Sequence, residues 1–282
     1  MQYIQIGDDR VPAIGQGTWK MGAEGQDHRA EAAAVRYGID VGLTLIDTAE
    51  AYAQGGSERV VAQAIKGIRD RVFLVTKVAP SNAGRDTFRH SLTESLKRLE
   101  TDYVDLYLLH WPSKTVPLEE TLAAMTLAHR DGLIRYIGLS NFPTEHLDEA
   151  QTLLGDLPIA ADQVEYQLTN RRAETALIPY AARHGKAIMA YSPVKDLFDL
   201  GENHPGIKTL NNTAESHRVS AETVALAYLI GSGPVVAIPK AVQRAHIDAN
   251  RQALDLELSA DERRAIQEAF PSPGEDLPFV AL

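Results

Sequence analysis

Short apolar runs recur along the chain, and segments with helical spacing of apolar residues separate them. The runs predict strands at residues 13–18, 43–47, 72–78, 104–110, 134–140, 159–166, 187–194 and 235–240. Most of these runs are continuous rather than alternating, which indicates strands that are covered on both faces. The opening residues YIQIGDDRVPAI predict a β-hairpin that turns at Gly7–Asp9.

The segments between the strands have the periodicity of amphipathic helices. In the clearest one, residues 86–100, Phe88, Leu92, Leu96 and Leu99 fall on one stripe. Further helices are predicted at about 27–41, 57–68, 119–131, 145–154, 172–185, 215–231, 243–253 and 260–269.

Eight strands separated by helices predict a (β/α)₈ TIM barrel, with residues 1–282 forming a single domain. A doubly wound sheet is the structural alternative, and its fingerprint would be G-x-G-x-x-G after the first strand. The candidate stretch GQGTWK has Lys20 where the third glycine should stand. The barrel is therefore the better prediction.

Composition narrows the classes of function. The 282 residues carry 28 Lys plus Arg and 38 Asp plus Glu, a formal charge of −10, which argues against a nucleic-acid partner. The chain has no cysteine, so disulfides and cysteine-ligated metals are excluded, and a reducing cytoplasm is expected. No stretch is apolar for long enough to predict a membrane span, and the first residues do not resemble a signal peptide.

Polar residues mark the ends of seven successive predicted strands. They are Asp47, Lys77, His110, Ser140 with Asn141, Gln163, Tyr191 with Ser192, and Lys240. In a barrel the carboxyl ends of the strands face one mouth, where active sites are built. Each residue alone has an ordinary structural explanation, such as capping for Asp47, solvent contact for Lys77 or a core hydrogen bond for His110. Their convergence on one rim favours a functional site.

Asp47, Tyr52, Lys77 and His110 together suit the reduction of a carbonyl group. A lysine ammonium beside a phenol favours phenolate, so we expect Lys77 to lower the pKa of Tyr52 from its usual value near ~10. Asp47 would keep Lys77 charged, and a neutral His110 could donate a hydrogen bond to the carbonyl oxygen. The sequence shows no nucleophile motif and no metal-ligand spacing, so no metal is expected and the hydride would come from a cofactor.

The remaining strand ends could hold that cofactor. Ser140, Asn141 and Gln163 offer the amide and hydroxyl groups that a nicotinamide carboxamide needs, and the Tyr191 ring could stack on the nicotinamide. The stretches SPV (192–194) and IPKA (238–241) follow the last two strands, where many barrels bind phosphate. Lys240, Arg244 and His246 form a local basic cluster there. The alternatives are a packing tyrosine and a solvated start of a helix.

The chain resembles the aldo-keto reductase superfamily over its whole length. The similar motifs are GQGTW (15–19), LIDTAEAY (45–52), VFLVTKV (72–78), LYLLHWP (106–112), IRYIGLSNF (134–142), QVEY (163–166), AYSPV (190–194) and IPKA (238–241). Within the superfamily the chain is most similar to bacterial reductases of small aldehydes such as methylglyoxal.

The resemblance implies a catalytic tetrad of Asp47, Tyr52, Lys77 and His110, with Tyr52 as the proton donor. It implies a cofactor site made of Gly17, Thr18, Trp19, Asp47, Ser140, Asn141, Gln163, Tyr191, Ser192, Pro193, Val194, Leu197, Ile238, Pro239, Lys240, Ala241, Arg244, His246 and Asn250. It places the substrate against Trp19, Tyr52, His110 and Trp111, and the N-terminal hairpin at the floor of the barrel.

Three positions depart from family members that strongly prefer NADPH. Ala241 replaces a serine or threonine, His246 an arginine, and Ala249 a glutamate. NADPH is still the expected cofactor because Lys240, with Arg244, can pair with the 2′-phosphate, and use of NADH is a second option. The segment 195–206 also departs from the usual loop of small residues, and the tail 275–282 carries little information on specificity.

Two other functions remain open at this point. Lys77 could form a Schiff base, as in barrel aldolases. A non-catalytic subunit that keeps the barrel and its nucleotide is the other alternative. We expect a monomer whose partner is a small carbonyl compound.

Overall fold

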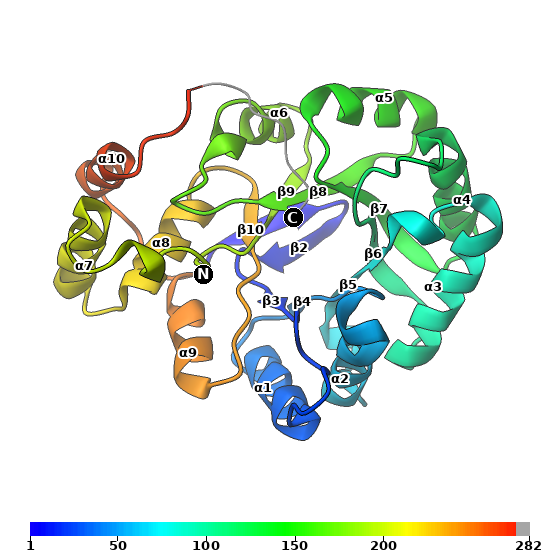
Figure 1. The fold of residues 1–282 in the computed structure, drawn as a ribbon, viewed down its shortest axis with the longest axis horizontal. Helices are drawn as coiled ribbons and strands as arrows, with labels where there is room; N and C mark the ends of the chain where they lie inside the picture. The colour runs from blue at the N-terminus through cyan, green and yellow to red at the C-terminus, as the bar shows by residue number, and fades with distance from the viewer. Residues whose placement is uncertain (275–282) are drawn as a thin grey trace.

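The computed structural model describes residues 1–274, apart from the side chain of Phe198. Its centre is a parallel sheet of eight strands, each hydrogen-bonded to its neighbours in chain order (Figure 1). The strands are β3 (Gln16–Gly17), β4 (Leu45–Asp47), β5 (Phe73–Val78), β6 (Val104–Leu109), β7 (Ile134–Ser140), β8 (Ile159–Glu165), β9 (Ala187–Tyr191) and β10 (Val235–Ala237). All eight lie within the predicted ranges.

The first and last strands of the sheet meet, so the sheet closes on itself. Ile14 forms a parallel bridge with Ala237. The amide of Gly15 donates to the carbonyl of Ala237 at 2.8 Å, and the amide of Ala237 donates to the carbonyl of Ala13 at 2.9 Å. Closure removes the exposed edges of the sheet and confirms the (β/α)₈ barrel.

Helices surround the barrel, as Figure 1 shows. They are α1 (His28–Asp40), α2 (Gly56–Ile65), α3 (Arg85–Leu99), α4 (Leu118–Arg130), α5 (Thr144–Leu154), α6 (Leu177–Arg183), α7 (Pro205–His217), α8 (Ala221–Ile230), α9 (Arg244–Gln252) and α10 (Ala260–Ala269). The stripe predicted on α3 is confirmed, since Phe88, Leu92, Leu96 and Leu99 are all buried. Burial of these side chains against the barrel stabilises the helix more than its intrinsic propensity does.

Two predicted helices are wrong in their extent. The segment 215–231 is not one helix, because α7 ends at His217 and the next residue, Arg218, is left-handed with φ of 56°. Ser220 then caps α8 by accepting a hydrogen bond from the amide of Thr223. The segment 172–185 begins as a separate 3₁₀ turn, Arg172–Glu174, before α6 starts at Leu177.

The N-terminal hairpin covers the end of the barrel where the strands begin. It consists of β1 (Tyr3–Ile6) and β2 (Asp9–Pro12), which pair antiparallel around Gly7. The backbone amide of Asp8 donates to the phenol oxygen of Tyr136, near the start of β7, at 3.1 Å. A Cβ on Gly7 would lie 2.1 Å from the Tyr136 ring, so glycine is required for this close approach. The floor position of the hairpin is confirmed, and the opposite end of the barrel stays open.

Candidate active site

The polar residues at the strand ends surround one cavity of about 530 Å³. Asp47 ends β4, Ser140 ends β7 and Tyr191 ends β9, while Gln163 lies in β8 and His110 follows β6. These side chains meet because parallel strands in a barrel all end at the same face. Lys77, on β5, is completely buried behind Asp47 and Tyr52.

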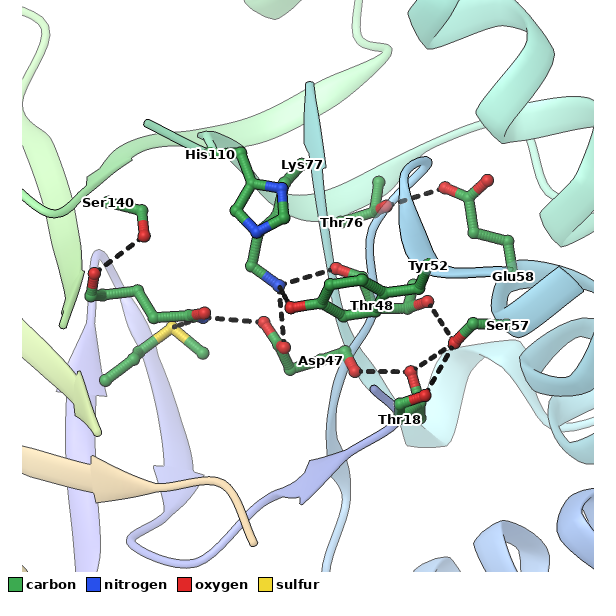
Figure 2. Close-up of polar contacts among 12 residues, drawn as sticks. Thr18, Asp47, Thr48, Tyr52, Ser57, Glu58, Thr76, Lys77, His110 and Ser140 are labelled. Carbon is green, nitrogen blue, oxygen red and sulfur yellow. Dashed lines mark hydrogen bonds and ion pairs between the residues drawn. The ribbon is translucent and has the colours of Figure 1, made fainter. Parts of the chain in front are cut away.

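Asp47, Tyr52 and Lys77 form a connected group (Figure 2). The Nζ of Lys77 donates to Oδ2 of Asp47 at 2.8 Å, to the carbonyl of Thr48 at 2.8 Å and to Oη of Tyr52 at 3.2 Å. All three donor positions of the ammonium group are therefore used. A buried lysine that is paired and fully hydrogen-bonded can remain charged inside a protein.

The charges in this group change the acidity of its members. Burial lowers the pKa of Lys77, but Asp47 and Tyr52 outweigh it, so the pKa of Lys77 is raised and the ammonium stays charged. Burial raises the pKa of Tyr52, and Lys77 lowers that pKa by less, so the net direction is upward. Our expectation of a net lowering at Tyr52 is wrong, because the burial of the phenol outweighs the lysine. Tyr52 is therefore a neutral phenol at pH 7, which is the form that can donate a proton.

His110 lies beside Tyr52, and both line the cavity. The two rings lie edge to face, with centroids 5.6 Å apart. Burial, together with the charge of Lys77, lowers the pKa of His110 to about 3. The imidazole is thus neutral at physiological pH and has one N–H to offer to a bound oxygen.

A second polar group, made of Ser140, Asn141, Gln163 and Tyr191, also lines the cavity. Asn141 has a left-handed backbone, with φ of 67°, a conformation that asparagine tolerates better than most residues. Its Nδ2 donates to Oγ of Ser140 at 2.9 Å, and its Oδ1 accepts from the phenol of Tyr191 at 3.1 Å. The Nε2 of Gln163 donates to Oδ1 of Asp47 at 2.7 Å, so this group is joined to the group that contains Lys77 and Tyr52.

Many of the residues assigned to the cofactor line the same cavity. They are Gly17, Trp19, Asp47, Ser140, Asn141, Gln163, Tyr191, Ser192, Pro193, Val194, Ile238, Pro239 and Lys240. Lys240 is exposed at the rim, which leaves its ammonium accessible. The sequence reasoning missed Lys195 and Ala51, which also line the cavity. The sequence feature that could have indicated Lys195 is its position directly after the SPV stretch (192–194).

Within residues 1–274, the other residues assigned to the cofactor do not line this cavity. The hydroxyl of Thr18 is buried and donates to the carbonyl of Asp47 at 2.8 Å. Arg244 lies over the ring of Tyr37 at 4.8 Å. The rest are buried Leu197 and Asn250, partly exposed Ala241, and exposed His246.

The donor set fits a nicotinamide dinucleotide. Asn141, Ser140 and Gln163 bring amide and hydroxyl groups to one wall, and Tyr191 brings a flat ring beside them. Lys240 adds a positive charge at the rim, as a phosphate would require.

Two tryptophans line the same cavity as Tyr52 and His110. Trp19 and Trp111 both line it, and Trp19 is 51% exposed. The lining of the cavity is therefore partly aromatic, which suits a small and partly apolar ligand. The tail 275–282 lies outside the described residues.

The sequence matches known proteins over almost its full length. The family model described as "Aldo/keto reductase family" matches residues 13–270. Methylglyoxal reductase YeaE of Escherichia coli (strain K12) is 44% identical over 267 residues, which is 95% of this chain and 94% of that protein. Methylglyoxal reductase DkgB of Salmonella typhi is 34% identical over 266 residues, which is 91% of this chain and 92% of that protein.

Solved structures are similar as well. The crystal structure of an aldo/keto reductase from Klebsiella pneumoniae, in complex with NADP and acetate, has a TM-score of 0.93 and 40% identity and covers 99% of both chains. A crystal structure of an aldo-keto reductase from Klebsiella pneumoniae in complex with NADPH has the same TM-score of 0.93 and the same 40% identity, over 100% of this chain and 99% of that one. These comparisons confirm the resemblance drawn from the motifs.

Proposed function

The chain belongs to the aldo/keto reductase family, and from this premise we propose that it reduces small aldehydes of the methylglyoxal type through Asp47, Tyr52, Lys77 and His110. The family and its NADP-bound relatives establish the general activity, which is NADPH-dependent reduction of a carbonyl group. The substrate and the roles of individual residues are the new part. The observation that carries them is the contact of Lys77 with Tyr52 at 3.2 Å, on the wall of a cavity that His110 also lines.

In this proposal Tyr52 donates the proton and His110 orients the substrate. NADPH, when bound, supplies the hydride that reduces the carbonyl carbon. The neutral imidazole of His110 donates a hydrogen bond to the carbonyl oxygen and holds it near Oη of Tyr52. Tyr52 then transfers its proton to that oxygen and becomes a phenolate. The ammonium of Lys77 stabilises this phenolate, and Asp47 keeps the ammonium charged and in place.

Ser140, Asn141 and Gln163 would hold the carboxamide, and Tyr191 would stack on the nicotinamide ring. The hydrogen bonds among these side chains support the assignment, because they hold the amide groups in fixed orientations on one wall. Lys240 would pair with the 2′-phosphate from the rim.

The Schiff-base alternative for Lys77 is not favoured. An amine must lose its proton before it attacks a carbonyl, and the raised pKa of Lys77 keeps the group protonated. All three donor positions of its ammonium are also occupied within the protein. The intact tetrad likewise argues against a non-catalytic subunit.

A small substrate suits the aromatic lining of the cavity. Trp19, Trp111, Tyr52 and His110 all line the cavity, and all four have uncharged rings. Two relatives are named as methylglyoxal reductases, which supports the same substrate class.

The test follows nicotinamide absorbance with a panel of 2-oxoaldehydes, simple aldehydes, ketones and sugars, using NADPH and NADH in turn. We expect the highest kcat/KM for small 2-oxoaldehydes with NADPH. Tyr52→Phe is the control, since it should abolish the signal with every substrate. A preference for sugars or bulky ketones would contradict the proposed substrate class.

We also propose that residues 1–282 form one domain that acts as a monomer in the cytoplasm. No helix within residues 1–274 is long and apolar enough to cross a membrane. The absence of cysteine suits a reducing compartment. Light scattering after size-exclusion chromatography would test the monomer, and a mass near 30.8 kDa is the expected result.

A further inference from the structure

Tyr52 is followed by a turn that is costly for its residue types. Ala53 and Gln54 have φ of 49° and 53°, and Gly55 has φ of 80°, so three successive residues are left-handed. A left-handed conformation is unfavourable for a non-glycine residue, because its Cβ crowds the following carbonyl oxygen. A turn of this kind persists only when the surrounding structure holds it.

Arg98 of α3 lies directly against this turn. A Cβ on Gly55 would be 2.4 Å from Cδ and 2.5 Å from Nε of Arg98, so only glycine leaves room for the arginine. The Nη2 of Arg98 donates to Oγ of Ser95 at 3.0 Å, one turn earlier on the same helix. The arginine is therefore held on α3 while it packs on the turn that carries Tyr52.

Glu58 connects Arg98 to the strand that carries Lys77. Glu58 is completely buried, and its Oε2 accepts from Nε of Arg98 at 2.6 Å. Its Oε1 accepts from the hydroxyl of Thr76 at 2.7 Å, a contact that Figure 2 shows. Thr76 precedes Lys77 on β5, and neighbouring residues of a strand point to opposite faces. The carboxylate thus reaches β5 from outside the barrel, directly behind the active site.

We propose that Glu58 and Arg98 are positioning residues that set the separation of Tyr52 and Lys77. The inference rests on the proposed role of Tyr52 as the proton donor. Glu58 lies in the first turn of α2, and the amide of Gly56, also in that turn, donates to the carbonyl of Tyr52. One carboxylate therefore links the element that holds Tyr52 to the strand that holds Lys77, without contact with the cavity.

The chain contains a matched ion pair that serves as a control. Asp105 accepts from Arg69 at 2.8 Å, from Arg135 at 2.9 Å and from the amide of Leu74, near the beginning of β5 and β6. The exposures of its side chains, 3% for Asp105 and 17% for Arg69, are close to the 0% and 19% of Glu58 and Arg98. This pair lies at the floor of the barrel, far along the strands from the site. Loss of the Asp105 carboxylate should affect folding at least as much as loss of the Glu58 carboxylate.

The experiment compares Glu58→Gln with Asp105→Asn. Each variant keeps the size of the side chain and places an amide where the carboxylate met arginine. We expect Glu58→Gln to lower kcat about tenfold or more, because small misplacements of a catalytic group are costly. Its dissociation constant for NADPH, measured by quenching of tryptophan fluorescence, should change less than about twofold, which is under 0.5 kcal/mol.

The pH profile separates a positioning role from a structural one. Tyr52 must be protonated to donate, so reduction slows as the pH rises through the pKa of Tyr52. A weaker contact between Tyr52 and Lys77 raises the pKa of Tyr52. The alkaline limb of the profile of kcat against pH should therefore move to higher pH in Glu58→Gln and stay in place in Asp105→Asn. An equal loss of kcat in both variants, or an unmoved limb in Glu58→Gln, would overturn the proposal.

Thr76 gives a second pair of variants if Glu58→Gln does not fold. Thr76→Val removes the hydroxyl and keeps the shape, and Thr76→Ser keeps the hydroxyl. The valine variant should show the shifted limb and the serine variant should not, whereas identical profiles would refute the link.

Tyr52→Phe distinguishes failure of the proposed function from failure of the positioning role. If that variant keeps its turnover, the proposed function fails. If it loses turnover while Glu58→Gln and Thr76→Val behave as wild type, only the positioning role fails.

Discussion

Gln163 and Asp47 are joined by a hydrogen bond of 2.7 Å from Nε2 to Oδ1, across 116 residues of sequence. The other oxygen of Asp47 accepts from Lys77 at 2.8 Å. One buried carboxylate therefore contacts both a residue assigned to the carboxamide and the lysine that adjoins Tyr52. Asp47 orients the two halves of the site relative to each other.

Asp47→Asn should destabilise the protein and reduce its activity. The variant leaves the Lys77 ammonium buried without its counter-ion, and breaking a buried pair in this way costs roughly 3–5 kcal/mol. Urea unfolding at pH 7 measures this loss, and we expect kcat to fall at least about 100-fold because the proton donor loses its charged neighbour.

The stability of Asp47→Asn should also depend on pH in a new way. In the wild type the pKa of Lys77 is raised above its unfolded-chain value of ~10.5. The stabilisation that the charged lysine provides is therefore fully present below pH ~10.5 and is lost only as the pH rises through the folded pKa. Without Asp47, burial lowers the pKa, the unfolded chain binds more protons, and stability should increase from pH 7 to 9.5. Asp105→Asn is the control. Its partners Arg69 and Arg135 cannot lose a proton, so this variant should show no such recovery of stability. A flat profile for Asp47→Asn would contradict this account of Lys77.

His110 should remain neutral, and functional, well below neutral pH. Its pKa of about 3 predicts no loss of kcat/KM from its protonation between pH 8 and pH 5. The unfolded histidine, with a pKa near ~6.5, binds a proton that the folded one does not, so stability is lost as the pH falls through that value, by up to ~1.4 kcal/mol per pH unit. His110→Gln should reduce this loss between pH 6.5 and pH 5. An unchanged loss in this variant would show that His110 is not held neutral.

Lys240→Ala should distinguish the two dinucleotides. A hydrogen bond to a charged group contributes ~1.5–3 kcal/mol, so the KM for NADPH should rise about 10-fold to 100-fold. The KM for NADH, which lacks the 2′-phosphate, should change little. Lys208→Ala, an exposed lysine on α7, is the matched control and should affect neither. Equal changes for both dinucleotides would place the 2′-phosphate elsewhere.

Ala53→Gly should stabilise the protein. Glycine adopts φ of 49° without the penalty that alanine has, so the gain should be about 1 kcal/mol and the rise in Tm about 2–4 °C. Ala123→Gly, at an exposed position inside helix α4, should have the opposite sign and cost about 0.5–1 kcal/mol. Differential scanning calorimetry measures both. A loss of stability in Ala53→Gly would mean that the turn is not strained.

The barrel and most of its cavity could be predicted from the sequence because both depend on strand ends. Continuous apolar runs mark the strands, and the polar residue that ends each run must face the same mouth as the others. Asp47, His110, Ser140 and Gln163 were found in this way, and the structure places all four on one cavity.

What the sequence could not reveal depends on burial and on neighbours far away in the chain. The direction of the pKa shift at Tyr52 follows from how deeply the phenol is buried. Ala53 and Gln54 are left-handed although neither residue type predicts it, because α2 and Arg98 impose the turn. The break between α7 and α8 was missed because Arg218 is not a helix breaker by type, although Ser220 was a readable cap.

The most direct test of the account is a pair of measurements on Tyr52→Phe, which removes one oxygen and leaves the ring. We expect an unchanged dissociation constant for NADPH by fluorescence and a kcat for a small aldehyde that falls by roughly 10²–10⁴-fold. A variant that binds NADPH normally and turns over at the wild-type rate would contradict the assignment of Tyr52 as the proton donor.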